Sequence, residues 1–144
     1  MGLTGIVDRS YSLLVGRKSD ARERLIESGC SLIHERGYTA VGVSEVCARA
    51  GVNKGSFYYF FPSKQELAKA VIEDFWEQHT PLLEALVDGP QPPLERLRAF
   101  FALSFESQCA LKQEAGQMLG CPFGNLSTEM STQDEEIRLK INEI

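Results

Sequence analysis

The sequence lacks the features that mark several classes of protein. No apolar run approaches the roughly 20 residues that a membrane-spanning helix needs, and the first twenty residues lack the basic-then-apolar order of a secretory signal. The four cysteines are widely spaced without a Cys-x-x-Cys pair, and there are only two histidines. This pattern argues against a disulfide framework and a zinc site. We therefore expect a cytoplasmic protein with no metal or other cofactor.

The alternating pattern of a half-buried strand is also missing, because nowhere does a period of two persist for five residues. Apolar residues instead recur at helical spacing, and glycine or proline separates the segments. The expected fold is therefore all-α. Helices are expected after Asp20 as far as Gly37, after Ser44, over 53–60, from Ser63 to about 87 with a kink or break at Pro81, over 94–108, over 123–130, and after Asp134.

Charge is divided unevenly along the chain. The whole sequence has a net charge of −5, but residues 1–69 carry a net +3 and residues 70–144 a net −8. A nucleic-acid-binding module joined to a domain with another task would give such a division. A small basic surplus is also common on ordinary protein surfaces, so charge alone does not decide between the two.

The most informative segment is residues 42–61, GVSEVCARAGVNKGSFYYFF. Two short helical patterns meet at Gly51, which is the arrangement of a helix-turn-helix. Val46, Ala50 and Phe57 belong to the expected inner face. The outward residues offer a cation, hydroxyls, an amide and aromatic rings, the groups that contact phosphates and base edges in a major groove. These outward residues are Asn53, Lys54, Gly55, Ser56, Tyr58 and Tyr59.

The flanks of this segment extend the pattern over residues 22–70. A first helix ends in Gly37-Tyr38, the two short helices follow, and Ser63-Lys64-Gln65-Glu66-Leu67 opens the next helix. The whole pattern resembles the TetR family of bacterial transcriptional regulators. The resemblance implies a sequence-specific DNA-binding regulator, a repressor, that binds a palindromic double-stranded operator as a homodimer. It also implies release from DNA by a small-molecule effector, and no enzyme activity.

The resemblance assigns a role to each outward residue. Phosphate contacts fall to Ser44, Tyr58 and Lys64, and the groove-facing positions to Lys54, Gly55, Ser56 and Tyr59. Asn53 is included among the DNA-binding candidates as an outward residue. The simpler alternative for Tyr58 and Lys64 is a solvated surface. Cys47 stands where the family usually has alanine, which should alter packing slightly and leave DNA binding intact.

The second half resembles the effector-binding domain of the family more loosely. Residues 120–130 are similar to a Gly-Cys-x-x-Gly-Asn-Leu segment of one subset, some of whose members respond to electrophiles or small acyl compounds. This suggests an effector site that includes Cys121 and Cys109. The bland alternative is that both thiols are small buried hydrophobes and the aromatic residues plain core. The candidate effector residues are Phe101, Phe105, Cys109, Met118, Cys121 and Phe123.

Three parts are thus expected: an arm over 1–19, a DNA-binding domain over 20–67, and a partial effector-binding and dimerisation domain over 68–144. The chain is short for the family, and its last apolar pattern runs to Ile144 without a stop signal. We therefore expect a truncated effector domain that leaves apolar surface exposed. Helix 94–108 is nevertheless apolar around more than half its circumference, which predicts that it is largely buried.

Two other functions stay open at this point. One is a small enzyme with Cys121 as nucleophile and His79 as base, although no recognisable spacing supports the pair. The other is a helical interaction module that uses the helix-turn-helix only as a scaffold.

Overall fold

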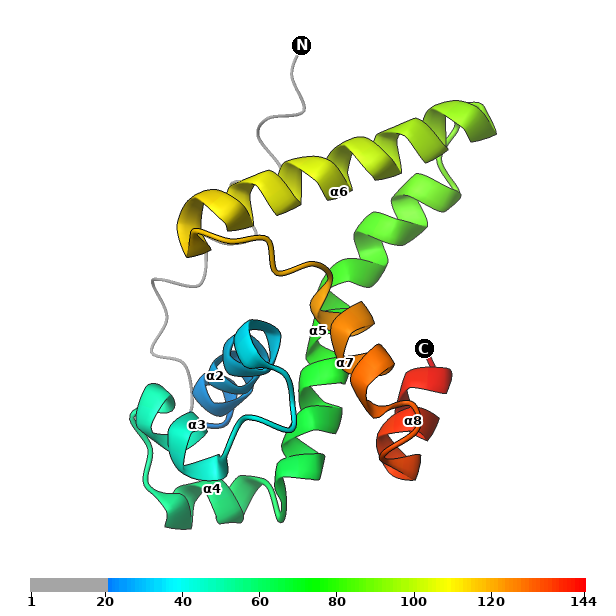
Figure 1. The fold of residues 1–144 in the computed structure, drawn as a ribbon. Helices are drawn as coiled ribbons and strands as arrows, with labels where there is room; N and C mark the ends of the chain where they lie inside the picture. Colours follow the sequence, from blue (N-terminus) through cyan, green and yellow to red (C-terminus); the bar gives the residue numbers. More distant parts are fainter. Residues whose placement is uncertain (1–20) are drawn as a thin grey trace.

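A computed structural model describes residues 21–144, and over this range it contains seven α-helices and no strand. Helices α2 (Ala21–Arg36), α3 (Val43–Ala50) and α4 (Lys54–Phe60) lie beside the lower half of the long helix α5 (Lys64–Val87) (Figure 1). Helix α6 (Pro93–Ala115) crosses above them, and α7 (Pro122–Met130) and α8 (Glu135–Asn142) lie along the other side of α5. The expected all-α class is confirmed. The expected arm over 1–19 and the cap at Asp20 lie outside the described residues.

Most of these helices begin or end at the glycine and capping residues that the sequence predicts. Gly37 and Gly51 take the left-handed backbone conformation, with φ of +83° and +65°, at the ends of α2 and α3. The side chains of Asn53, Ser63 and Asp134 each accept a hydrogen bond from the backbone amide three residues later, at 2.8, 3.2 and 3.0 Å. Each of these side chains satisfies an amide that has no partner within its own helix.

The prediction that Ser44 caps α3 is wrong. The helix begins at Val43, and its N-cap is Gly42, whose backbone N–H donates to Glu45 Oε2 at 3.0 Å. The Glu45 carboxylate thus satisfies the amide from inside the helix, so no side-chain oxygen is needed at the cap position. Ser44 lies exposed in the first turn.

The long helices differ in part from expectation. Helix α5 does not break at Pro81 but continues through it as one element, and hydroxyl and imidazole groups bond to carbonyls in the preceding turn. Thr80 Oγ1 donates to Trp76 O, and His79 Nδ1 bonds to Phe75 O, both at 2.7 Å. Helix α6 runs to Ala115, beyond the expected end at residue 108, because no glycine interrupts it before residue 116.

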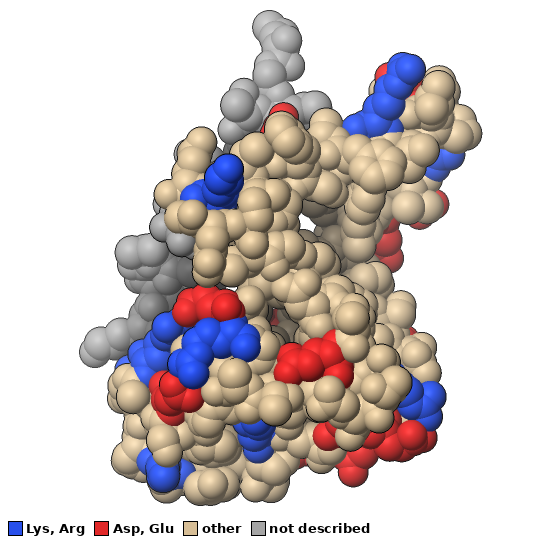
Figure 2. All heavy atoms as spheres, in the orientation of Figure 1, with Lys and Arg blue, Asp and Glu red and all other residues tan. Residues whose placement is uncertain are grey.

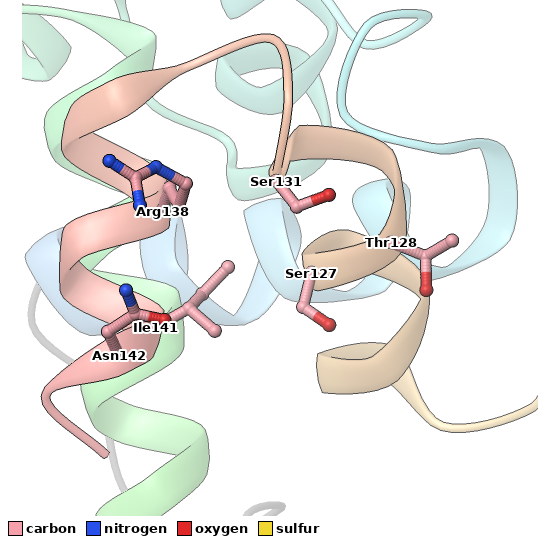
Figure 3. A pocket seen from close by; sticks show the side chains of 6 residues that line it. All are labelled: Ser127, Thr128, Ser131, Arg138, Ile141 and Asn142. Atoms are coloured by element: carbon pink, nitrogen blue, oxygen red, sulfur yellow. The ribbon is translucent and has the colours of Figure 1, made fainter.

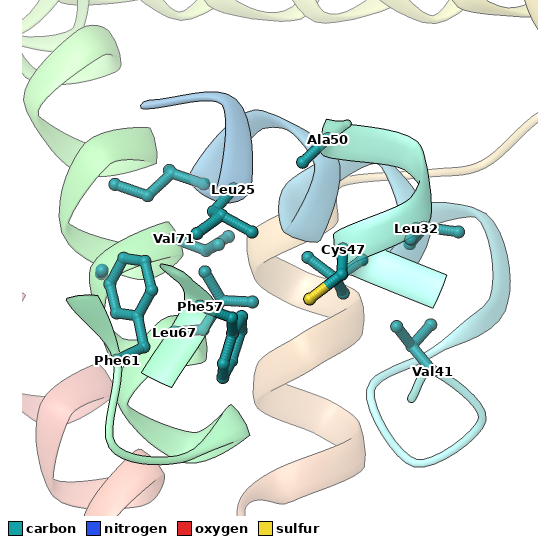
Figure 4. Packing of buried hydrophobic residues seen from close by; sticks show 12 residues of the cluster. Leu25, Leu32, Val41, Cys47, Ala50, Phe57, Phe61, Leu67 and Val71 are labelled. Carbon is teal, nitrogen blue, oxygen red and sulfur yellow. The ribbon is translucent and has the colours of Figure 1, made fainter. Parts of the chain in front are cut away.

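The first hydrophobic core joins α2, α3, α4 and the start of α5 (Figure 4). Leu25, Val46, Phe57 and Leu67 are completely buried in it. Helices α2 and α5 approach closely at Gly29, where a Cβ would lie only 3.0 Å from a methyl group of Leu67. The expected inner face is confirmed for Val46, Ala50 and Phe57.

A second buried cluster attaches α7 and α8 to the same helices. It combines residues of α2, the following turn, α5, α7 and α8, which are Ile33, Tyr38, Ala68, Ile72, Leu126, Met130 and Ile137. Ile141 and Ile144 are partly buried against it, so the expected apolar face of the last helix does pack inward. Helix α5 therefore contributes residues to both buried clusters.

The prediction that the helix after the proline-rich linker is largely buried is wrong for this chain. Its Leu97, Phe101 and Phe105 are 51%, 61% and 69% exposed. Apolar residues do occupy more than half of the circumference of α6. Among the described residues, however, too few pack against this helix to cover them. The surface along α6 carries charge mainly near its ends (Figure 2). Exposed apolar surface, which the shortness of the chain predicts, is thus present on α6. None of the described helices is long and apolar enough to cross a membrane.

The first core predicts a large difference between two leucines of α5. Leu67→Ala should lower the free energy of unfolding by about 2–5 kcal/mol, because it leaves a cavity against Gly29 and Phe57. Leu82→Ala removes a side chain that is 42% exposed and should cost less than about 1 kcal/mol. Urea denaturation followed by circular dichroism measures both. Equal losses would contradict this placement of the core.

Candidate DNA-binding interface

Helix α4 is anchored on one side and presents two tyrosines on the other. Phe57 is completely buried, whereas Tyr58 and Tyr59 are 54% and 82% exposed. Each tyrosine ring meets its neighbouring phenylalanine edge to face: Tyr58 with Phe57 at 5.2 Å, and Tyr59 with Phe60 at 4.9 Å between ring centres. The buried phenylalanine thus fixes the helix whose exposed residues would meet a ligand.

The start of α4 carries the other expected groove-facing residues. Lys54 and Gly55 are exposed, and Ser56 is half-buried. Lys54 forms no ion pair with any described residue, so its ammonium group remains available. Asn53 is also exposed, but its Oδ1 accepts the Ser56 amide at 2.8 Å. The Asn53 side chain is therefore partly occupied by capping, which leaves chiefly its NH₂ group to meet a base.

Arg36 at the end of α2 and Arg49 of α3 are engaged within the protein. Arg49 forms a two-bond pair with Glu35, at 2.6 and 3.1 Å, and also donates to Ser31 Oγ at 2.9 Å. Hydrogen bonds from Arg49 and then Ser31 hold the pKa of Glu35 below its ordinary value. Arg36 pairs with Glu45 at 2.6 Å. These contacts fasten α3 to α2.

Lys64, the expected phosphate contact at the start of α5, is bonded within the protein. Its Nζ donates to the backbone carbonyls of Tyr38 and Val41 at 3.0 and 2.9 Å, and it sits 4.1 Å from the centre of the Tyr38 ring. Burial lowers the pKa of Lys64, and the charge of Glu129 partly opposes this effect. The ammonium group is directed at the protein itself, so the structure gives Lys64 a structural role that sequence reasoning missed.

Glu129 of α7 is the second residue that sequence reasoning missed. Its two carboxylate oxygens accept the backbone amides of Tyr38 and Thr39, at 2.7 and 2.8 Å. Burial acts to raise the pKa of Glu129, but the hydrogen bonds from Thr39 and Tyr38 outweigh it and hold this pKa below its ordinary value. No local motif could have revealed a contact between residues about 90 positions apart.

The candidate effector residues do not meet in one enclosed cavity. Phe101, Phe105 and Cys109 have the spacing of one face of α6, with both rings largely exposed, and Met118 is 58% exposed. Phe123 instead packs toward α5, where its ring lies 6.3 Å from Phe75 and 6.4 Å from Trp76.

Two hollows lie near these helices, and of the candidate effector residues only Phe123 lines either of them. A small one between α2, α5 and α7 is lined by Cys30, Ile33, Val71, Ile72, Phe75, Pro122, Phe123 and Leu126. An open one between α7 and α8 is lined by Ser127, Thr128, Ser131, Arg138, Ile141 and Asn142 (Figure 3).

The cysteines fall into different environments. Burial, with a smaller effect of Asp74, raises the pKa of Cys30 to about 11, so this thiol stays protonated. Cys121 is exposed at the N-cap of α7, where its Sγ accepts the Gly124 amide at 3.4 Å. The alternative that Cys121 is a buried hydrophobe is therefore wrong. His79, the partner of the enzyme hypothesis, is stacked on Phe75 at 4.0 Å and bonded to its carbonyl.

Residues 25–71 match the family of bacterial regulatory proteins described as the tetR family. This segment belongs to the TetR family. The match covers most of α2, all of α3 and α4, and the buried start of α5, the elements that form the first core.

Curated relatives extend the similarity beyond this segment. The transcriptional regulator AcuR of Cereibacter sphaeroides is 37% identical over 119 residues, which cover 82% of this chain and 52% of AcuR. The transcriptional repressor NemR of Escherichia coli is 33% identical over 120 residues, which cover 83% of this chain and 58% of NemR. The chain thus spans little more than half the length of these relatives. Both are named as regulators and not as enzymes.

Solved structures show the same fold. A TetR regulatory protein from Rhodobacter sphaeroides is 36% identical with a TM-score of 0.73, covering 87% of this chain and 65% of that one. The reduced form of NemR from E. coli is 32% identical with a TM-score of 0.72, covering 87% and 63%. The expected architecture, an N-terminal helix-turn-helix followed by further helices in a chain shorter than these structures, is confirmed.

The two lysines of the expected site should behave differently on substitution. Lys64→Met leaves the carbonyl of Val41 without this donor and the carbonyl of Tyr38 with the Val41 amide alone, and it should lower the free energy of unfolding by about 1–3 kcal/mol. Lys54→Met removes an exposed group and should change it by no more than about 0.5 kcal/mol. Urea unfolding compares them. Unchanged stability in Lys64→Met would contradict its structural role.

Proposed function

We propose that the protein is a transcriptional repressor that binds operator DNA with α4 in the major groove. The observation that carries this proposal is the arrangement of α4, with Phe57 buried in the core and Lys54, Tyr58 and Tyr59 exposed. A cation and phenol hydroxyls can contact phosphates, and aromatic rings can contact base edges. Membership of residues 25–71 in the TetR family and the names of the relatives support the same function.

The short length of α4 favours a dimer as the functional unit. Its seven residues extend about 10 Å, which corresponds to about three base pairs of B-DNA. So short a contact specifies too little sequence to define an operator, and a second copy doubles it. TetR-family regulators usually act as dimers. We therefore expect a palindromic operator whose half-sites lie one helical turn, about 34 Å, apart.

The effector half is proposed to release the DNA when a small electrophilic or acyl compound binds. The site is proposed to include Phe101, Phe105, Cys109 and Met118 together with Cys121 and Phe123. An exposed apolar face on α6 and an accessible thiol at the start of α7 support it. Coupling free energies of this kind are about 1–3 kcal/mol, equivalent to a 5- to 150-fold change in operator affinity.

The proposed function is tested by selecting bound duplexes from a random pool at fixed salt concentration. The chain should enrich one half-site sequence, and a dimer should enrich two inverted copies at the expected spacing. Binding without any sequence preference would favour the helical interaction module instead.

Two residues of α4 should affect binding in different ways. Lys54→Met should weaken binding to all sequences about equally and lower the slope of log affinity against log salt by about 1. Tyr59→Ala should change the sequence preference. Lys112→Met, which alters an exposed cation on α6, is the control and should leave both unchanged. Uniform weakening by Tyr59→Ala would contradict its placement in the groove.

The thiols give a test of the effector proposal. A quinone should abolish operator binding by the unmodified protein, because an exposed thiolate adds to it. Cys121→Ser should remove most of this response, and the double variant with Cys109→Ser should remove the rest. Cys30→Ser is the matched control, since its buried thiol stays protonated, and it should respond fully. An undiminished response in the double variant would refute the role of these thiols.

A further inference from the structure

The turn at residues 37–42 links α2 to α3, and it is held by a side chain from the other half of the chain. Glu129 of α7 accepts the amides of Tyr38 and Thr39, one on each carboxylate oxygen. Gly37 makes room for this contact, since a Cβ there would lie 3.0 Å from Glu129 Oε2. A carboxylate that accepts two backbone N–H groups forms charge-assisted bonds, which are stronger than neutral ones. Glu129 therefore attaches this turn firmly to α7.

The same turn is held from its other side by α5. Lys64 donates to the carbonyls of Tyr38 and Val41, so two amides of the turn are bound from α7 and two of its carbonyls from α5. Val41 is only 2% exposed and belongs to the first core. The turn is thus a fixed link between three helices.

The turn at residues 37–42 also sets the position of α3. Its last residue, Gly42, is the N-cap of that helix and is bonded to Glu45, which also pairs with Arg36. Helix α3 is followed after Gly51 and two further residues by α4. A displacement of the turn would therefore reach the helix that carries Tyr58 and Tyr59.

The position of α7 depends on the segment that carries the candidate effector residues. The carbonyl of Gly120, just before α7, lies 2.9 Å from His34 Nε2 and accepts a bond from Gln108 Nε2 of α6 at 3.0 Å. Gln108 is adjacent to Cys109, and Gly120 is adjacent to Cys121. A chemical change at Cys109 or Cys121 can therefore displace α7 through the contacts of the Gly120 carbonyl.

We propose that Glu129 is the positioning residue through which the effector half controls α3 and α4, by fixing the turn at residues 37–42. The proposal rests on the proposed function for its last step, the fit of α4 to DNA. It differs from a purely stabilising contact because loss of Glu129 should disturb the helix-turn-helix and leave the rest of the fold unchanged.

The test is amide hydrogen exchange measured by NMR on the full chain, with and without Glu129→Ala. Exchange at Tyr38 and Thr39 should become about tenfold faster, and exchange should also rise across residues 43–60. Glu129→Gln keeps one acceptor oxygen and should give a smaller change at the same positions. Affinity for the half-site found by the duplex selection should fall in the same order.

Two controls separate positioning from general stability. Glu135→Gln neutralises a carboxylate that pairs only with Arg138 within α8, and it should match the unsubstituted protein. Ile137→Val removes one buried methylene from α8, and it should lower the melting temperature without selective exchange in 38–60. If Ile137→Val produces the same pattern as Glu129→Ala, the role of Glu129 is merely structural and the proposal is wrong.

The remaining outcomes are also decisive. Unchanged exchange at Tyr38 and Thr39 in Glu129→Ala overturns the proposal, and so does a change confined to these two amides. If amide exchange rises across residues 43–60 while the affinity for DNA stays the same, Glu129 does not control the fit of α4 to DNA. If the unsubstituted chain selects no duplex, the proposed function fails, while the exchange data still decide whether Glu129 positions α3 and α4.

Discussion

The burial of the first turns of α5 on two sides supports the rest of the structure. Leu67, Ala70 and Val71 pack into the core of α2, α3 and α4, while Ala68 and Ile72 pack against α7 and α8. A helix used in this way cannot shift relative to one group of helices without disturbing the other, because both contacts lie on the same two turns. The predicted division of the chain after residue 67 therefore does not coincide with a gap in packing.

The local parts of the fold could be predicted from the sequence, because their causes lie within a few residues. Asn53, Ser63 and Asp134 cap helices with their own side chains, and the spacing of Val46, Ala50 and Phe57 marks one face. The bonds from Lys64 and Glu129 to the turn at 37–42 could not be predicted, since they join residues 23 to 91 positions apart. Exposure of α6 was mispredicted for a related reason, because an apolar face does not tell which segment covers it.

The helix-turn-helix region offers fewer available cations than its composition suggests. Arg36, Arg49 and Lys69 pair with carboxylates, and Lys64 is directed at backbone carbonyls. Basic residues used inside the protein release no counterions from DNA. The net +3 of residues 1–69 already counts the paired carboxylates, but these four cations are less available to a phosphate backbone than the exposed Lys54 is. Binding by one copy should depend more on shape and on the tyrosines of α4 than on attraction over a distance.

The cap at Asn53 has a consequence for how such a protein can acquire a new operator. In the proposed complex, a substitution at Tyr59 alters an exposed side chain and leaves the helix intact, so it can change the sequence preference at little structural cost. A substitution at Asn53 removes the acceptor of the Ser56 amide and loosens the first turn of α4 at the same time. Divergence of binding preference should therefore proceed through the exposed positions, while Asn53 constrains the paths that remain open.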